Sequence, residues 1–226
     1  MFLSISTSTL RTLAISAFIV SLSSATLSAT QAGFDGWNWL QTTTTLHAQF
    51  EQRTLDKSGE SVGSSAKGEL WIQRPGKFRW RYDQPNQQLT ISDGKKISWY
   101  DPQLKQIVTK PVKGSLGNAL AQLLTSDTKN LKTHFKSEQI TQPEGYSLKV
   151  TPFNADQEGF KNITLNWTLD KIQPVLRDIV ILDGFGQHIA FKLTHVETPA
   201  PASLSSTLFS FTPPSGTSIV NENLEN

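Results

Sequence analysis

The 226-residue sequence contains no cysteine, which excludes disulfide bonds, thiol chemistry and lipid attachment to a cysteine behind a leader. Its four histidines are scattered, and none is spaced from another histidine or an acid as metal ligands are. No phosphate-binding loop and no pair of catalytic carboxylates stands out. We therefore predict that the protein is not an enzyme and holds no cofactor and no metal.

Long apolar runs are also scarce, and the clearest one lies in an N-terminal leader. Met1 to Ala32 carries one basic residue, Arg11, then an apolar run over residues 13–22, then small residues. This is the layout of a secretory signal peptide, and the run is too short to span a bilayer as a mature helix. We predict export to the periplasm with cleavage near Ala32, leaving a single soluble domain over residues 33–226.

An excess of charge of either sign is missing too. Without the leader the chain keeps 20 basic and 19 acidic residues, because the leader contributes one arginine and no acid. A near-neutral chain favours neither nucleic acid nor an acidic surface as a partner.

The pattern that is present is alternation of apolar and polar residues. In the stretch from Leu70 to Pro102, one strand precedes a turn at 74–76, a second alternates Phe78, Trp80 and Tyr82 with basic residues, and a hairpin signal lies at 93–94. Similar runs recur along the chain and end with a predicted short strand at Leu208–Phe211. About eleven strands in this order predict a mainly β fold, an antiparallel sheet curled into an incomplete barrel.

One segment has a helical period instead. From residue 115 to 124, apolar residues recur at offsets of four, seven and eight, which predicts a short amphipathic helix. An incomplete barrel of this size can enclose a hydrophobic cavity but needs a cover, and we predict that this segment is the lid. The lid residues are Leu116, Leu120, Leu123 and Leu124.

Arg74 is the unusual residue of the opening hairpin. By alternation it shares the apolar face of Leu70 and Ile72, where a guanidinium must find acceptors or reach water. Two interpretations remain open on the local sequence. Arg74 is either a strand-end arginine that extends into solvent or a polar latch at the rim of an apolar cavity.

A catalytic alternative depends on Ser61. Residues 59–63 match the pattern G-x-S-x-G, but that motif requires a strand before it and a helix after it. Here a polar loop, predicted over 56–65, precedes a strand. The pattern therefore indicates a hairpin connection rather than a hydrolase.

The assembled pieces resemble the LolA family of bacterial periplasmic lipoprotein carriers. The resemblance rests on GELWIQRPGKFRWRY, on SDGKKISWYDPQLKQ, on LHAQF at 46–50 and on FSFTPPSG near the end, and it covers the mature chain in order. It implies an incomplete antiparallel barrel closed by short helices over a hydrophobic cavity. It also implies that Arg74 hydrogen-bonds to the lid and loses those bonds when lipid enters, and that Phe78 is a rim aromatic. The predicted cavity and rim residues are Leu70, Ile72, Phe78, Trp80, Ile91 and Trp99.

The same resemblance implies the partners. A monomeric carrier of this family accepts acylated lipoproteins from an ABC transporter of the inner membrane and hands them to an outer-membrane receptor. A different class of function remains open at this point, a periplasmic lipid- or lipoprotein-binding sensor or adaptor domain with the same fold. A sensor would bind cargo without passing it on.

Overall fold

The computed structural model describes residues 33–112, 123, 131–154, 159–170, 173–200 and 204–222. The strands are β1 (Thr45–Leu55), β2 (Ser61–Gln73), β3 (Lys77–Gln84), β4 (Gln88–Asp93), β5 (Lys96–Asp101), β6 (Gln106–Pro111), β7 (Phe135–Gln142), β8 (Gly145–Pro152), β9 (Phe160–Asp170), β10 (Gln173–Asp183), β11 (His188–Glu197) and β12 (Ser218–Asn221). The helices are α1 (Gly36–Thr42), α3 (Leu131–His134) and the 3-10 helix η2 (Ser206–Phe209). No helix in these described ranges has the length and hydrophobicity needed to cross a membrane.

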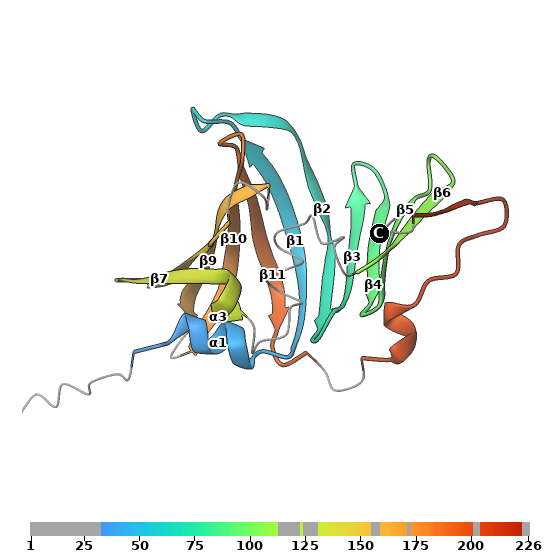
Figure 1. Ribbon diagram of the computed structural model, residues 1–226. Coiled ribbons are helices and arrows are strands. Elements are labelled where there is room, and N and C mark those ends of the chain that lie inside the picture. Colours follow the sequence, from blue (N-terminus) through green and yellow to red (C-terminus); the bar gives the residue numbers. More distant parts are fainter. Residues whose placement is uncertain are drawn as a thin grey trace, which may run out of the picture. The chain divides into compact units, whose positions relative to one another are not determined.

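All twelve strands belong to one curved, open sheet (Figure 1). Its order is β12-β6-β5-β4-β3-β2-β1-β11-β10-β9-β8-β7, so two antiparallel meanders, β1 to β6 and β7 to β11, are joined where β1 pairs with β11. Among the strands of the described residues, only β12 pairs in parallel, with β6. The predicted fold class, an incomplete antiparallel barrel, is therefore confirmed, with twelve strands instead of about eleven.

Alternation along the strands gives the sheet a buried face, which we call the inner face. In β1 the buried side chains are Leu46, Ala48 and Phe50, and their neighbours in sequence point to the opposite, outer face. Antiparallel partners share a face, so Leu70 of β2 lies opposite both Ala48 and Trp80. The buried cluster continues through β8 to β11 with Leu148, Val150, Ile163, Leu165, Trp167, Leu176, Ile179, Phe191 and Leu193.

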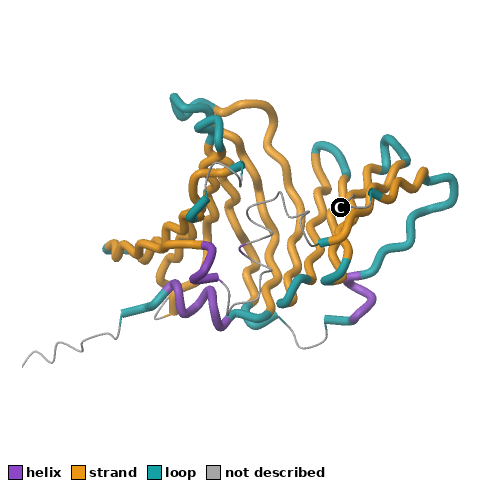
Figure 2. The backbone as a smooth tube through the Cα atoms, in the orientation of Figure 1, coloured by secondary structure: helices purple, strands orange, loops and turns teal. Residues whose placement is uncertain are grey.

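Helix α1 lies against one end of this inner face (Figures 1 and 2). Asp35 caps it by accepting hydrogen bonds from the backbone N–H groups of Trp37 and Asn38. Leu40 is fully buried, and the Trp39 ring meets Trp167 edge-on at 5.2 Å. This short helix covers apolar surface that an open sheet would expose.

The end of the chain departs from the prediction. We expected a strand at Leu208–Phe211, but residues 206–209 form η2. Ser205 caps this turn by accepting a hydrogen bond from the Thr207 N–H, and Phe209 is buried. The alternation was misleading because both aromatic side chains are used outside a sheet: the Phe211 ring packs on Tyr100 at 4.9 Å. The last strand is instead β12, a four-residue addition to the β6 edge.

The hairpin between β1 and β2 is tighter than expected. The polar loop predicted over 56–65 is limited to a turn at 56–60, since β2 begins at Ser61. Asp56 organises this turn by accepting hydrogen bonds from the backbone of Ser58 and Glu60. Ser61 lies at an exposed strand start that pairs with Leu55, so the strand-to-helix elbow of a serine hydrolase is not formed.

Candidate functional site

Arg74 follows β2 directly and turns its side chain toward Leu123. Its backbone N–H donates to the Thr44 carbonyl at 2.8 Å, which fixes the start of the turn. Its guanidinium Nη2 donates to the carbonyl oxygen of Leu123 at 3.1 Å. Burial lowers the pKa of Arg74 to about 10, so the guanidinium is still charged at neutral pH. A partly buried cation therefore binds a main-chain oxygen 49 positions away.

Leu123 is the one described residue of the predicted lid. It is helical and fully buried, and it belongs to the same apolar cluster as Leu70 and Phe78. A helical residue thus packs on the inner face beside the arginine that holds its carbonyl. The other lid residues, Leu116, Leu120 and Leu124, lie outside the described residues.

Most of the predicted cavity and rim residues come together on the inner face. Leu70 pairs with Trp80, and Ile72 pairs with Phe78, so these four buried side chains form a patch across β2 and β3. Trp99 packs against the same cluster from β5. Their roles in holding a ligand stay a prediction, but the register explains why residues six or ten positions apart are neighbours.

Ile91 is the exception among them. It pairs with Arg79, and Arg79 points away from Phe78 and Trp80, so Ile91 lies on the outer face. Its side chain is nevertheless buried. Leu89 and Ile107 are buried on the same side, where the segment 204–212 lies over β3 and β4. The expected place of Ile91 at the cavity was wrong because the register puts this residue on the outer face, where η2 lies against β3 and β4.

An aromatic cluster occupies the middle of the inner face. The Phe50 ring lies 5.3 Å from Trp80, 5.2 Å from Tyr82 and 5.7 Å from Phe191. Tyr82 brings a hydroxyl into this apolar region, where it donates a hydrogen bond of 2.6 Å to Gln52 Oε1. Sequence analysis missed the pair Tyr82 and Gln52, although both residues have the parity of the inner face. The cluster is therefore a large, buried and mainly apolar group of rings with one hydroxyl among them.

Titration of Tyr82 tests how dry this region is. Burial raises the pKa of Tyr82 to about 12. Because the raised pKa favours the neutral phenol in the folded state, its contribution to stability is complete below pH 10 and is lost as the pH rises toward 12. In an absorbance titration of the three tyrosines, we expect one phenolate to form near pH 12, and Tyr82→Phe to remove that step alone. Loss of a step near pH 10, rather than near pH 12, in the Tyr82→Phe variant would contradict a dry inner face.

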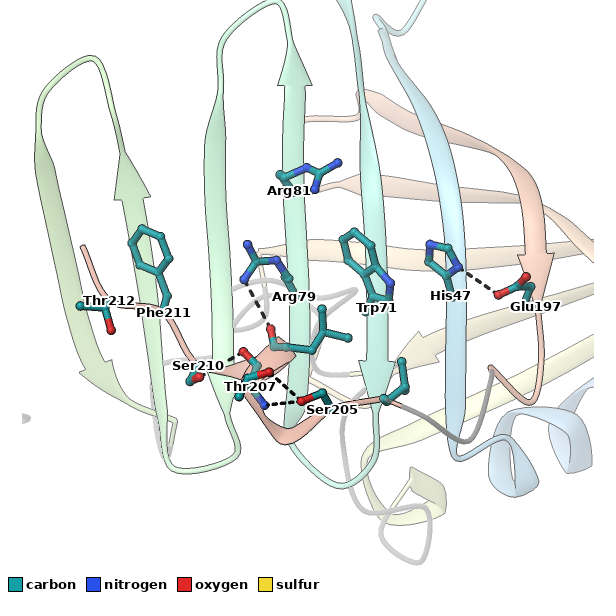
Figure 3. A pocket seen from close by; sticks show the side chains of 12 residues that line it. His47, Trp71, Arg79, Arg81, Glu197, Ser205, Thr207, Ser210, Phe211 and Thr212 are labelled. Atoms are coloured by element: carbon teal, nitrogen blue, oxygen red, sulfur yellow. Dashed lines mark hydrogen bonds and ion pairs between the residues drawn. The ribbon is translucent and has the colours of Figure 1, made fainter. Parts of the chain in front are cut away.

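The outer face carries a separate pocket that the sequence did not indicate (Figure 3). Its volume is about 760 Å³, and its floor includes Trp71, Arg79 and Arg81, with the segment 204–212 along one side. His47 reaches it from β1 and pairs with Glu197 of β11 at 3.1 Å between Nδ1 and Oε2. These two residues are 150 positions apart, so only the β1–β11 pairing brings them together.

Metal and nucleophile chemistry finds no support in the described part of the chain. Within it, no group of three or more histidine, aspartate or glutamate side chains is placed to hold a metal ion. The hydrophobic inner face and the Arg74 hydrogen bond remain the features that distinguish the site.

The chain is similar to known proteins in sequence and in fold. The family model described as outer membrane lipoprotein carrier protein LolA matches residues 41–212. A protein of Nitrosospira multiformis named outer-membrane lipoprotein carrier protein is 32% identical over 185 residues, which cover 82% of this chain and 86% of that protein. One of the same name from Nitrosomonas europaea is 34% identical over 179 residues, covering 79% and 83%. The crystal structure of an uncharacterised conserved protein from Thermus thermophilus aligns with a TM-score of 0.48 and 16% identity, covering 80% and 93%.

Proposed function

This chain belongs to the LolA family of outer membrane lipoprotein carrier proteins, and on that premise we propose that it carries lipoproteins by holding their acyl chains against the inner face of its sheet. The observation that carries the proposal is the buried patch of Leu70, Phe78 and Trp80, with Leu123 packed on it and tied to Arg74. Such a surface suits an apolar ligand.

The transfer route extends this proposal. With the leader over residues 1–32 removed near Ala32, the single domain 33–226 would act in the periplasm as a monomer. It would accept acylated lipoproteins from an ABC transporter of the inner membrane and deliver them to an outer-membrane receptor. Family membership supports this route, and the near-neutral charge is compatible with protein partners on both sides.

The energetics limit how the cargo can be held. Each buried methylene contributes about 0.8 kcal/mol, so acyl chains buried completely would bind with tens of kcal/mol before any cost is subtracted. Non-covalent affinity saturates near roughly 20 kcal/mol, and a carrier must also release its cargo. Partial burial and an opening step with a free-energy cost are therefore required.

We propose that Arg74 supplies part of that cost. A hydrogen bond from a charged donor contributes about 1.5 to 3 kcal/mol. If the bond from Arg74 to the Leu123 carbonyl breaks when acyl chains displace the predicted lid, the loaded state loses that free energy relative to the empty one. The arginine then weakens retention and favours delivery, which is the latch role that the family resemblance implies.

The transfer step itself gives the direct test. We would incubate inner-membrane vesicles containing a labelled lipoprotein with ATP and the purified mature protein, then separate membranes from the soluble fraction. Label should become soluble in a one-to-one complex only when both ATP and the protein are present. If the protein binds free lipid in a separate assay but releases no lipoprotein from membranes, the carrier proposal fails and the sensor or adaptor function replaces it.

A further inference from the structure

The pocket of the outer face is part of a longer groove. The 760 Å³ pocket shares Arg79, Arg81 and Phe211 with a second hollow of about 320 Å³. The second hollow adds Leu89 and Tyr100 of β4 and β5 to the lining. The lining residues of the two hollows come from β1 to β5 and from the segment 204–212, which borders the first hollow in Figure 3. The combined groove is longer than a small anion needs and suits an extended chain.

The two arginines of the groove differ in their partners. Arg81 forms ion pairs of 2.8 Å with Glu69 and with Asp83. Arg79 has no carboxylate within ion-pair distance in the described part of the chain, and its guanidinium donates a long bond of 3.4 Å to the Leu208 carbonyl. Burial, and then the charge of Arg81, lower the pKa of Arg79. Arg79 is a partly desolvated cation that lacks an anion, the arrangement that a bound carboxylate would complete.

The floor around Arg79 is fixed in place. The Trp71 ring stacks on His47 with centroids 5.0 Å apart and planes 10° apart, and the Arg81 guanidinium lies 5.6 Å from the same ring. Glu197 holds the other side of His47. Because these side chains brace one another, a ligand would not have to order them, which saves entropy on binding.

Charges along the groove select the kind of ligand. Glu197 lies in the first hollow and Asp83 in the second, while both hollows contain the arginines. A bilayer of anionic lipids would meet these acids as well as Arg79, whereas a single carboxylate with apolar neighbours meets only the arginine and the aromatic floor. We propose that the groove binds an extended segment of a partner polypeptide that places one carboxylate, between apolar residues, on Arg79.

This proposal goes beyond the carrier function and does not depend on it. Arg79 and Trp71 lie on the opposite side of the sheet from Phe78 and Trp80. A peptide on the outer face would therefore leave the inner face free, so a partner could hold the protein while cargo is bound.

The test uses two peptides with the purified mature protein. One is a fluorescein-labelled nonapeptide of glycine and serine with a central Leu-Glu-Tyr triplet, and the other has glutamine in place of glutamate. Fluorescence anisotropy should show the glutamate peptide binding about tenfold to a hundredfold more tightly. Equal affinity for the two peptides, or no binding of either up to about millimolar concentration, would overturn the proposal.

Variants locate the binding site. Arg79→Gln should weaken the glutamate peptide to the level of the glutamine peptide, and Arg53→Gln, which changes an exposed arginine of β1 outside the groove, should leave both affinities unchanged. Because Arg79→Gln also removes the bond to Leu208, the comparison of the two peptides on the unchanged protein decides independently.

If vesicles containing phosphatidylglycerol bind through Arg79 while the peptides do not, the ligand is a lipid surface and the peptide proposal is wrong. If the peptide proposal fails, the Arg79→Gln protein should still bind lipid. Its lipid binding therefore distinguishes failure of the peptide proposal from failure of the carrier proposal.

Discussion

Replacing Arg74 by leucine is expected to give a protein that takes up lipoprotein and delivers it poorly. The change removes the hydrogen bond to the Leu123 carbonyl and leaves an apolar side chain beside the inner face. If that bond exists only in the empty state, its loss favours the loaded state by about 1.5 to 3 kcal/mol, a factor of roughly 10 to 150 in the loading equilibrium. The measurement is the fraction of labelled lipoprotein that passes from the loaded variant to outer-membrane vesicles.

Two controls separate the bond from the charge and from general damage. Arg74→Lys keeps a cation but has no planar fork, so it should deliver cargo with intermediate efficiency. Arg53→Leu makes the same chemical change at an exposed position and should transfer normally. A folded Arg74→Leu protein that delivers as fast as the unchanged protein would remove Arg74 from the mechanism.

Replacing Gly68 by alanine is expected to destabilise the whole fold. Gly68 lies in β2 between Phe50 and Tyr82, where the register with β3 shifts. A Cβ there would lie 1.9 Å from the Arg81 carbonyl oxygen and 2.8 Å from Phe50 Cζ, so strand β3 would have to move. We expect a loss of about 3 kcal/mol or more in the free energy of unfolding, and a thermal midpoint lower by about 6 to 12 °C.

Gly184 provides the matched control. It lies in the β10–β11 hairpin with ordinary backbone angles, and the nearest atom to an added Cβ is 3.7 Å away. Gly184→Ala should therefore change stability by less than about 0.5 kcal/mol. Urea unfolding of both variants, compared at equal slope, measures the difference. Equal urea midpoints for the two variants would mean that β2 and β3 leave more room at Gly68 than the 1.9 Å approach to the Arg81 carbonyl oxygen allows.

The inner face could be predicted from the sequence because its signal is local. Leu46, Leu70 and Trp80 each stand in a run where apolar and polar residues alternate, and a strand has only two faces. The turn at 74–76 and the hairpin at 93–94 then fix which strands are neighbours. Arg74 could be identified as exceptional by the same rule, since it is charged at an apolar position.

The outer face could not be predicted in the same way. Ile91 is buried by a segment more than 100 residues later, so its own neighbourhood gives no sign of which face is covered. The run Leu208–Phe211 has the period of a strand, yet the cap at Ser205 and the contact with Tyr100 give it another conformation. The pocket pair His47 and Glu197 depends on one long-range strand pairing and has no local signal.

That long-range pairing also bears on how the chain reaches its folded state. Each meander is built from hairpins between consecutive strands, which close short loops at small entropic cost. The ladder between β1 and β11 joins residues as far as 150 positions apart, and neither meander supplies that closure by itself. A chain that folds from its N-terminal end must leave the apolar side of β1 exposed until β11, almost the last long strand, has appeared. The same apolar side chains that form the inner face are thus, during synthesis, a site where the unfinished chain can aggregate.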